Sequence, residues 1–86
     1  MSKREAQKEQ LKEMRKAILR ANQVYDLMKS INSLEKAIEA MMANEENPAY
    51  IQEMLNHTQE TIQKFRMHDT TRWEVCRWVQ TLICEM

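Results

Sequence analysis

Four side chains in this sequence, two histidines and two cysteines, have the chemistry to ligate a transition metal or to act in nucleophilic catalysis. They are His57, His68, Cys76 and Cys84, and successive members are 11, 8 and 8 positions apart. These spacings match no common zinc pattern. An oxyanion hole needs closely approaching backbone donors, usually beside a glycine, and the chain has no glycine. The sequence therefore predicts a non-enzymatic protein without catalytic residues, metal or cofactor.

Glycine and proline mark most sharp turns, and Pro48 is the single proline of the 86 residues. Asn47 is a preferred N-cap residue, and Pro48 suits the first position of a helix. With so few turn signals, we expect one all-α domain over residues 1–86, built as a long antiparallel helical hairpin. Its arms are residues 3–43 and 48–86, and its turn is residues 44–47.

Two polar segments could divide these arms into shorter helices. Asn32 with Glu35 resembles a capping box beside Ser30, and Thr71 with Glu74 resembles another at residues 68–71. Capping residues inside a helix can also simply face solvent. The sequence thus leaves open a hairpin of two long arms and a bundle of three or four shorter helices.

The first arm carries two apolar stripes, which an unbroken helix would place more than a quarter turn apart. Their residues are Leu11, Met14, Ile18, Ala21, Tyr25 and Met28 in one, and Val24, Leu27, Ile31, Leu34, Ile38 and Met41 in the other. Two faces indicate either two partners or a break. One stripe could face the second arm and the other a second copy or a different protein. We predict a homodimer that forms a helical bundle, with this second interface at Leu11, Met14, Ile18, Tyr25 and Met28.

The most distinctive local feature is a repeated Arg-Trp pair, Arg72-Trp73 and Arg77-Trp78. Tryptophan and arginine are enriched at protein interfaces, although each indole could instead cover the core of the bundle. We predict a protein–protein interaction module, such as a small adaptor, inhibitor or chaperone-like protein. Its predicted contact residues are Trp73, Arg77, Trp78, Leu82 and Met86, with Met41 and Met42 as an exposed patch beside the turn.

A basic ridge supports an alternative function, binding to a nucleic-acid backbone. Its members recur every four residues and are Arg4, Lys8, Lys12, Lys16 and Arg20. Glu5, Glu9 and Glu13 lie three positions before the lysines, where they can pair with them and weaken the field. The net charge of zero also argues against this alternative.

Charge is unevenly distributed along the chain. Residues 1–20 have a net charge of +4, and residues 35–60 have a net charge of −5. In a two-arm hairpin both termini lie at one end and the turn at the other. This predicts a molecule that is basic at its termini and acidic around its turn.

Composition also bears on the compartment. No apolar run approaches the ~18 residues of a membrane-spanning helix, and the charged N-terminus has no signal-peptide core. Cys76 and Cys84 lie about 12 Å apart along one helix, too far to form a disulfide within it. These features predict a cytoplasmic protein in a reducing compartment.

The turn Asn47-Pro48-Ala49, followed by a second helix of about forty residues, resembles the type III secretion needle subunits and their small co-chaperones. The resemblance covers only this turn and the arm lengths, and the paired tryptophans depart from it. It implies a needle subunit or co-chaperone as a further alternative function.

Overall fold

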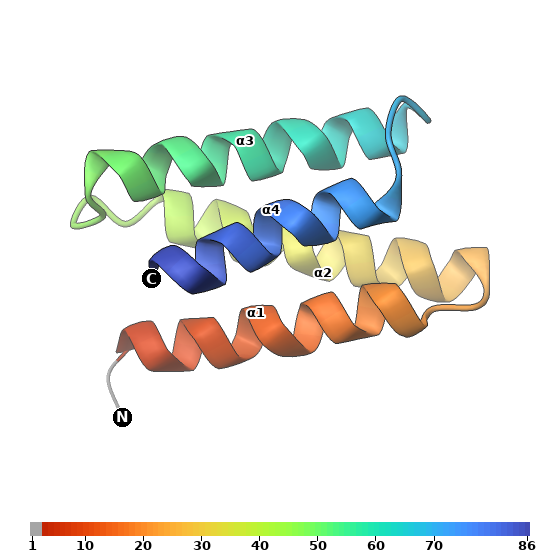
Figure 1. Ribbon diagram of the computed structural model, residues 1–86, viewed down its shortest axis with the longest axis horizontal. Helices are drawn as coiled ribbons and strands as arrows, with labels where there is room; N and C mark the ends of the chain where they lie inside the picture. The colour runs from red at the N-terminus through yellow and green to blue at the C-terminus, as the bar shows by residue number, and fades with distance from the viewer. Residues whose placement is uncertain (1–2) are drawn as a thin grey trace.

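In the computed structural model, which describes residues 3–86, the chain forms four α-helices. They are α1 (Lys3–Arg20), α2 (Val24–Met42), α3 (Ala49–Arg66) and α4 (Arg72–Glu85). Successive helices run in opposite directions and are joined by short connections (Figure 1). The prediction of an all-α fold is confirmed, in its four-helix form.

The helices form a closed ring around one core. α1 packs on α2, α2 on α3, α3 on α4, and α4 returns to pack on α1. This is the arrangement of an up-and-down four-helix bundle, in which each helix contacts two antiparallel neighbours. The bundle measures 36 × 25 × 19 Å along its principal axes.

Each helix contributes one apolar stripe to the shared core. The buried residues of this core are Leu11, Ile18, Ile31, Leu34, Ile38, Met41, Ile51, Leu55, Ile62, Val75, Cys76, Val79, Leu82 and Ile83. Two buried threonines are satisfied locally: the hydroxyls of Thr58 and Thr61 donate to the carbonyls of Met54 and His57, each at 2.8 Å. The core therefore closes without an unpaired threonine hydroxyl.

The first arm is broken at residues 21–23, whereas the sequence pattern placed the break near Ser30 and Asn32. The predicted break is wrong, because Asn32 and Ser33 lie on the exposed face of an uninterrupted α2. There the Asn32 side-chain oxygen accepts a hydrogen bond from Arg66 at 2.7 Å. The break at 21–23 resets the helical phase, so both apolar stripes contribute to the same core, apart from the exposed Val24 and Tyr25.

This reset removes the reason for expecting a second interface. Leu11 and Ile18 of the first stripe, and Leu34 of the second, are all fully buried within one chain. Two stripes on one rigid helix would have needed two partners. Two stripes on two antiparallel helices can be covered by packing against each other and against the other two helices of the same bundle.

The central connection joins α2 to α3 over residues 43–48. Pro48, rather than Asn47, is the N-cap of α3, with φ −59° and ψ 154°, so the predicted cap is displaced by one residue. The Asn47 amide instead donates to the Met41 carbonyl at 2.7 Å, and the Gln52 amide donates to the Met42 carbonyl at 3.1 Å. Both side chains thus satisfy carbonyls at the end of α2.

The connection between α3 and α4 covers residues 67–71, where the sequence pattern placed a possible break. His68 has φ 62°, a left-handed conformation. Its N–H donates to the Phe65 carbonyl at 3.1 Å, and the Asp69 N–H donates to the Lys64 carbonyl at 2.8 Å. These two bonds form a Schellman motif with histidine where glycine is usual.

The capping box expected at Thr71 and Glu74 is not formed. Thr71 is the N-cap of α4, but its side chain makes no capping hydrogen bond. The Glu74 N–H instead donates to the backbone carbonyl of Thr71 at 3.2 Å. The second arm consists of two helices, α3 and α4. The forty-residue helix that the resemblance to needle subunits requires is therefore not present.

None of the helices in residues 3–86 is long and apolar enough to cross a lipid bilayer.

Candidate interaction surface

The two histidines and two cysteines, which could ligate a metal or act in catalysis, are distributed over several parts of the bundle. His57 is on α3, His68 is in the connection to α4, and Cys76 and Cys84 are on α4. Across residues 3–86, no group of three or more histidine, cysteine, aspartate or glutamate side chains is placed to hold a metal ion. Each of the four is therefore understood through its own surroundings.

Cys76 packs as a small apolar side chain. Its thiol is buried between α4 and α1, with Sγ 4.0 Å from the Arg15 carbonyl oxygen. Burial raises the pKa of the Cys76 thiol, and the positive charges of Arg15 and Arg72 oppose this to a lesser extent. The raised pKa keeps Cys76 protonated at neutral pH, whereas Cys84 is an exposed free thiol.

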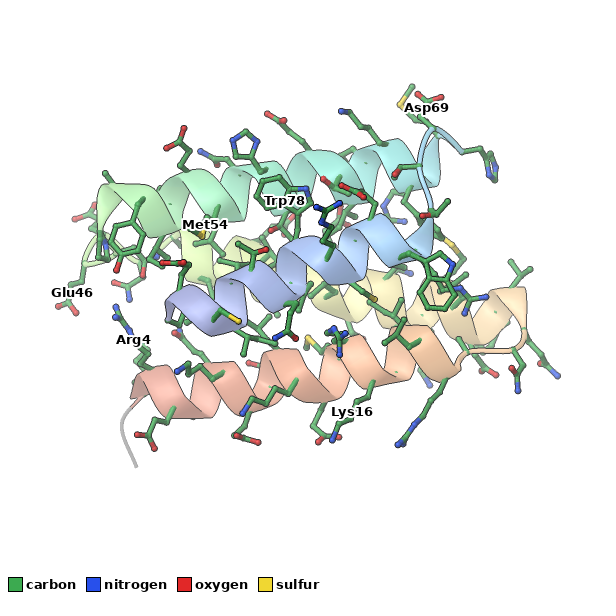
Figure 2. The ribbon with its side chains drawn as sticks, in the orientation of Figure 1. Arg4, Lys16, Glu46, Met54, Asp69 and Trp78 are labelled. Atoms are coloured by element: carbon green, nitrogen blue, oxygen red, sulfur yellow. The ribbon has the colours of Figure 1, made fainter. Side chains whose placement is uncertain are left out.

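The two tryptophans have different surroundings. Trp78 is half-buried and points from α4 towards α3 (Figure 2), where its ring stacks on His57 with centroids 5.0 Å apart and planes 20° from parallel. His57 is also 3.8 Å from the Glu60 carboxylate. Trp73 is exposed, and the Arg72 guanidinium lies 5.9 Å from its ring centroid. Trp78 thus joins two helices, and Trp73 is left on the surface.

Arg72, a residue absent from the predicted contact set, fastens α4 to the end of α1. Its guanidinium donates to the Ile18 carbonyl at 3.0 Å and to the Ala21 carbonyl at 2.7 Å. The Ile18 carbonyl belongs to the last turn of α1 and Ala21 follows the end of that helix, so neither carbonyl has a partner within the helix. The Arg-Trp repeat indicated that this segment is important. The carbonyl acceptors of Arg72 could not be predicted, because they depend on α1 and α4 lying side by side.

Several predicted contact residues are in the core. Leu82 and Met41 are buried, so they are closed to a partner, and the expected exposed patch at Met41 is wrong. Met42 and Met86 are half-buried against the core, and Arg77 is exposed. In the predicted second interface, Leu11 and Ile18 are buried, Met14 and Met28 are half-buried and Tyr25 is exposed.

The exposed large apolar side chains gather at one end of the bundle. Of the five such side chains among residues 3–86, four flank the connections 21–23 and 67–71: Val24 (77% exposed), Tyr25 (74%), Met67 (71%) and Trp73 (63%). Their end of the molecule is termed the apolar end. The pattern flagged Tyr25 and Trp73, but it assigned Val24 to a buried stripe.

A hollow opens at the apolar end between the start of α2 and the end of α3. It has a volume of about 430 Å³. Its lining residues are Val24, Leu27, Met28, Phe65, Arg66 and His68. The hollow is therefore lined mainly by apolar side chains, at the end where the exposed aromatic side chains lie.

The predicted charge separation is wrong, because the bundle brings both chain ends and the 43–48 connection to the same end (Figure 1). Figure 2 shows Arg4 and Glu46 there, with Asp69 at the opposite end. The half of the bundle that includes the apolar end, residues 12–32 and 58–78, has nine basic and five acidic side chains. The other half, residues 3–11, 33–57 and 79–86, has four basic and eight acidic side chains. The apolar end is thus on the basic half (+4), and the end with the 43–48 connection, termed the acidic end, is on the acidic half (−4).

The basic ridge lies along α1 and is partly neutralised. Lys12 Nζ is 3.2 Å from Glu9 Oε1, and Lys16 Nζ is 3.7 Å from Glu13 Oε1. The predicted pairing of these lysines with glutamates three positions earlier is confirmed. Such pairing leaves a weaker field along the ridge of Arg4, Lys8, Lys12, Lys16 and Arg20 than its spacing alone implies.

No family model matches the chain, and the searches of curated proteins and of solved structures return no match either. The interpretation of the surface therefore depends on its own geometry and chemistry.

Proposed function

We propose that this chain is a non-enzymatic protein-binding module that engages another protein through its apolar end. The observation that carries the proposal is the grouping of Val24, Tyr25, Met67 and Trp73 at one end of a bundle whose core is already closed. Scattered exposed apolar residues are normal on a protein surface, but a group of large ones at one place is typical of an interface.

The chemistry of the group supports a protein partner. Tryptophan and tyrosine give large contact areas at low cost in side-chain entropy, and methionine adapts to an irregular partner surface. The neighbouring hollow, lined by Leu27 and Phe65 among others, could receive an apolar side chain from the partner. The buried Cys76 supports the non-enzymatic part of the proposal, since its thiol is not presented to a substrate.

Crosslinked capture from a lysate of the native host tests this proposal. The wild-type chain is compared with the triple variant Val24→Ser, Tyr25→Ser and Trp73→Ser, followed by mass identification of the captured proteins. The matched control is Tyr50→Ser, because Tyr50 is also exposed but lies at the acidic end. We expect the triple variant to lose the captured protein and the control to retain it. Equal capture by the wild-type chain and the triple variant would overturn the proposal.

A further inference from the structure

We propose that the apolar end also docks on the acidic end of a second copy, so that chains associate head to tail. This inference rests on the proposed function, because it uses the same apolar end and names one partner for it. Two features of the molecule support it: its two ends are complementary in charge, and both ends carry exposed aromatic side chains.

The basic side of this contact consists of exposed cations around the apolar end. Arg20 ends α1, Lys29 lies in the second turn of α2, and Lys64 lies in the last turn of α3. The ion pairs found among residues 3–86 include none of these three cations. By contrast, Arg66 is committed to Glu35 at 2.9 Å. Three cations outside these ion pairs thus lie on the helices that meet at the apolar end.

The acidic side has the opposite character. Glu45 and Glu46 are exposed in the 43–48 connection, and Glu53 is exposed near the start of α3. They too are absent from the ion pairs of residues 3–86. Tyr50 is 49% exposed beside them. A hollow of about 430 Å³, lined by Met42, Asn44, Glu45, Asn47, Ala49 and Gln52, opens at the same end.

Charge selects between the possible modes of self-association. Two apolar ends brought together would place two halves of charge +4 in contact, and like charges at an interface disfavour association. An apolar end against an acidic end pairs +4 with −4. Such a contact is heterologous and leaves one free end on every copy, so it continues into an open chain rather than closing as a dimer.

The size of the ends sets the strength of the contact. The two shorter dimensions of the bundle, 25 and 19 Å, give the end a small cross-section of about 475 Å². Stable interfaces bury about 800 Å² per partner. The association is therefore weak, and we expect it at protein concentrations on the order of 0.1 to 1 mM at low ionic strength.

Sedimentation equilibrium of the wild-type chain, from about 0.01 to 1 mM, tests for the open chain. We expect the weight-average mass to rise past twice the mass of one chain and to fall again when salt is raised to about 0.5 M. A mass that levels off at a dimer would overturn the head-to-tail arrangement. A mass that stays at the monomer at about 1 mM and low salt would overturn self-association altogether.

Two charge-reversed variants test which surfaces meet. Glu45→Lys, Glu46→Lys and Glu53→Lys together make both ends basic, and Arg20→Glu, Lys29→Glu and Lys64→Glu together make both ends acidic. Each variant alone should be monomeric, and an equimolar mixture should associate at least about ten times more strongly than either one. The control Lys36→Glu changes an exposed charge in the middle of α2 and should associate like the wild type. Circular dichroism checks that every variant stays helical.

The outcomes separate this inference from the proposed function. If the mixture stays monomeric while the Val24, Tyr25 and Trp73 triple variant still loses a captured protein, self-association is refuted and the binding module stands. If the mixture associates while the triple variant captures the same proteins as the wild type, capture of another protein through the apolar end is refuted. In that case we expect the triple variant to stay monomeric at about 1 mM. If the triple variant still associates head to tail, the inference of self-association through the apolar end is also overturned.

Discussion

At the level of single residues, His68 performs the role that glycine usually has at the end of a helix. Its φ of 62° places it in the left-handed region, which costs a residue with a side chain roughly 1 kcal/mol. The sequence contains no glycine to avoid this cost. The absence of glycine led us to expect few sharp turns, yet the chain turns three times within residues 3–86.

Replacing His68 with glycine should stabilise the bundle. We expect His68→Gly to raise the free energy of unfolding by about 0.5 to 1 kcal/mol, because relief of the left-handed strain exceeds the added entropy of the unfolded chain. Urea denaturation followed by circular dichroism measures this change. The reference variant His68→Ala keeps a Cβ at the position and should not stabilise; equal gains from both variants would contradict the explanation.

The two cysteines should differ sharply in reactivity. In the native protein, a thiol reagent at pH 7.5 should modify Cys84 rapidly and Cys76 only after the bundle opens, because Cys76 is buried and its pKa is raised. Counting modified thiols with time should give one fast and one slow site, and two fast sites in denaturant. Cys84→Ser removes the fast phase; a fast phase that survives in this variant would show that Cys76 is accessible.

The raised pKa of Cys76 also gives stability a pH dependence. Above the ordinary thiol pKa of about 8.5, the unfolded chain loses the Cys76 proton while the folded chain keeps it. Unfolding then becomes more favourable, so stability should fall as pH rises from about 8.5 towards the raised pKa. Thermal unfolding of the wild type and of Cys76→Ala across this range checks the effect. The stability of Cys76→Ala should fall less steeply with pH than that of the wild type. An identical fall in both proteins would contradict a role for the Cys76 thiol.

At the level of helices, the sequence predicted one interruption and missed the other for a physical reason. At 68–71, Asp69, Thr70 and Thr71 have low helix propensity, so the end of a helix was visible. At 21–23, alanine and glutamine are good helix formers, and Asn22 is the single weak one. The remaining signal was the rotation between the apolar stripes, which indicates either two partners or a break and does not say where the break lies.

The start of α2 is a place where stability can be added. Gln23 is its N-cap, with an extended backbone and no side-chain capping hydrogen bond. Aspartate there can accept a hydrogen bond from an N–H of the first turn, so Gln23→Asp should stabilise the bundle by about 0.5 to 2 kcal/mol. Urea denaturation measures the gain. Gln23→Leu, which cannot accept such a bond, should give none.

The contact between α4 and α1 depends on Arg72. Removing its guanidinium leaves the carbonyls of Ile18 and Ala21 without their donor, and Arg72→Ala should cost about 1.5 to 3 kcal/mol. The exposed Arg77 offers a matched control, since Arg77→Ala should change stability by less than about 0.5 kcal/mol. Equal losses in thermal unfolding of the two variants would show that the hydrogen bonds to α1 are not responsible.

At the level of the whole molecule, the apolar pattern predicted most of the residues that avoid water, with Val24 and Tyr25 as exceptions, but not what covers them. Leu11 and Ile18 were assigned to a second interface, and Leu82 to a partner surface, because a two-arm hairpin cannot bury so many apolar side chains. Closing α4 onto α1 buries all three inside one chain. Which stripes meet depends on the turns, and the turn at 21–23 lacked a clear signal.

Truncation of a core residue distinguishes a core from an interface. Leu11→Ala should lower the free energy of unfolding by about 2 to 5 kcal/mol, because a cavity remains where the side chain was. Trp73→Ala, at an exposed site, should cost less than about 1 kcal/mol. Chemical denaturation at two protein concentrations compares them. If the loss for Leu11→Ala grew on dilution, Leu11 would belong to an interface between copies.

The contact between the first and last helices also has a consequence in time. α1 is synthesised first, yet one of the two neighbours that cover its apolar stripe is α4, the last helix to be made. Until Arg72 and Cys76 have been translated and have reached α1, Leu11 and Ile18 stay partly open to water on a nascent chain. Synthesis of this bundle therefore includes an interval in which its earliest helix is the one most exposed to aggregation and to chaperones.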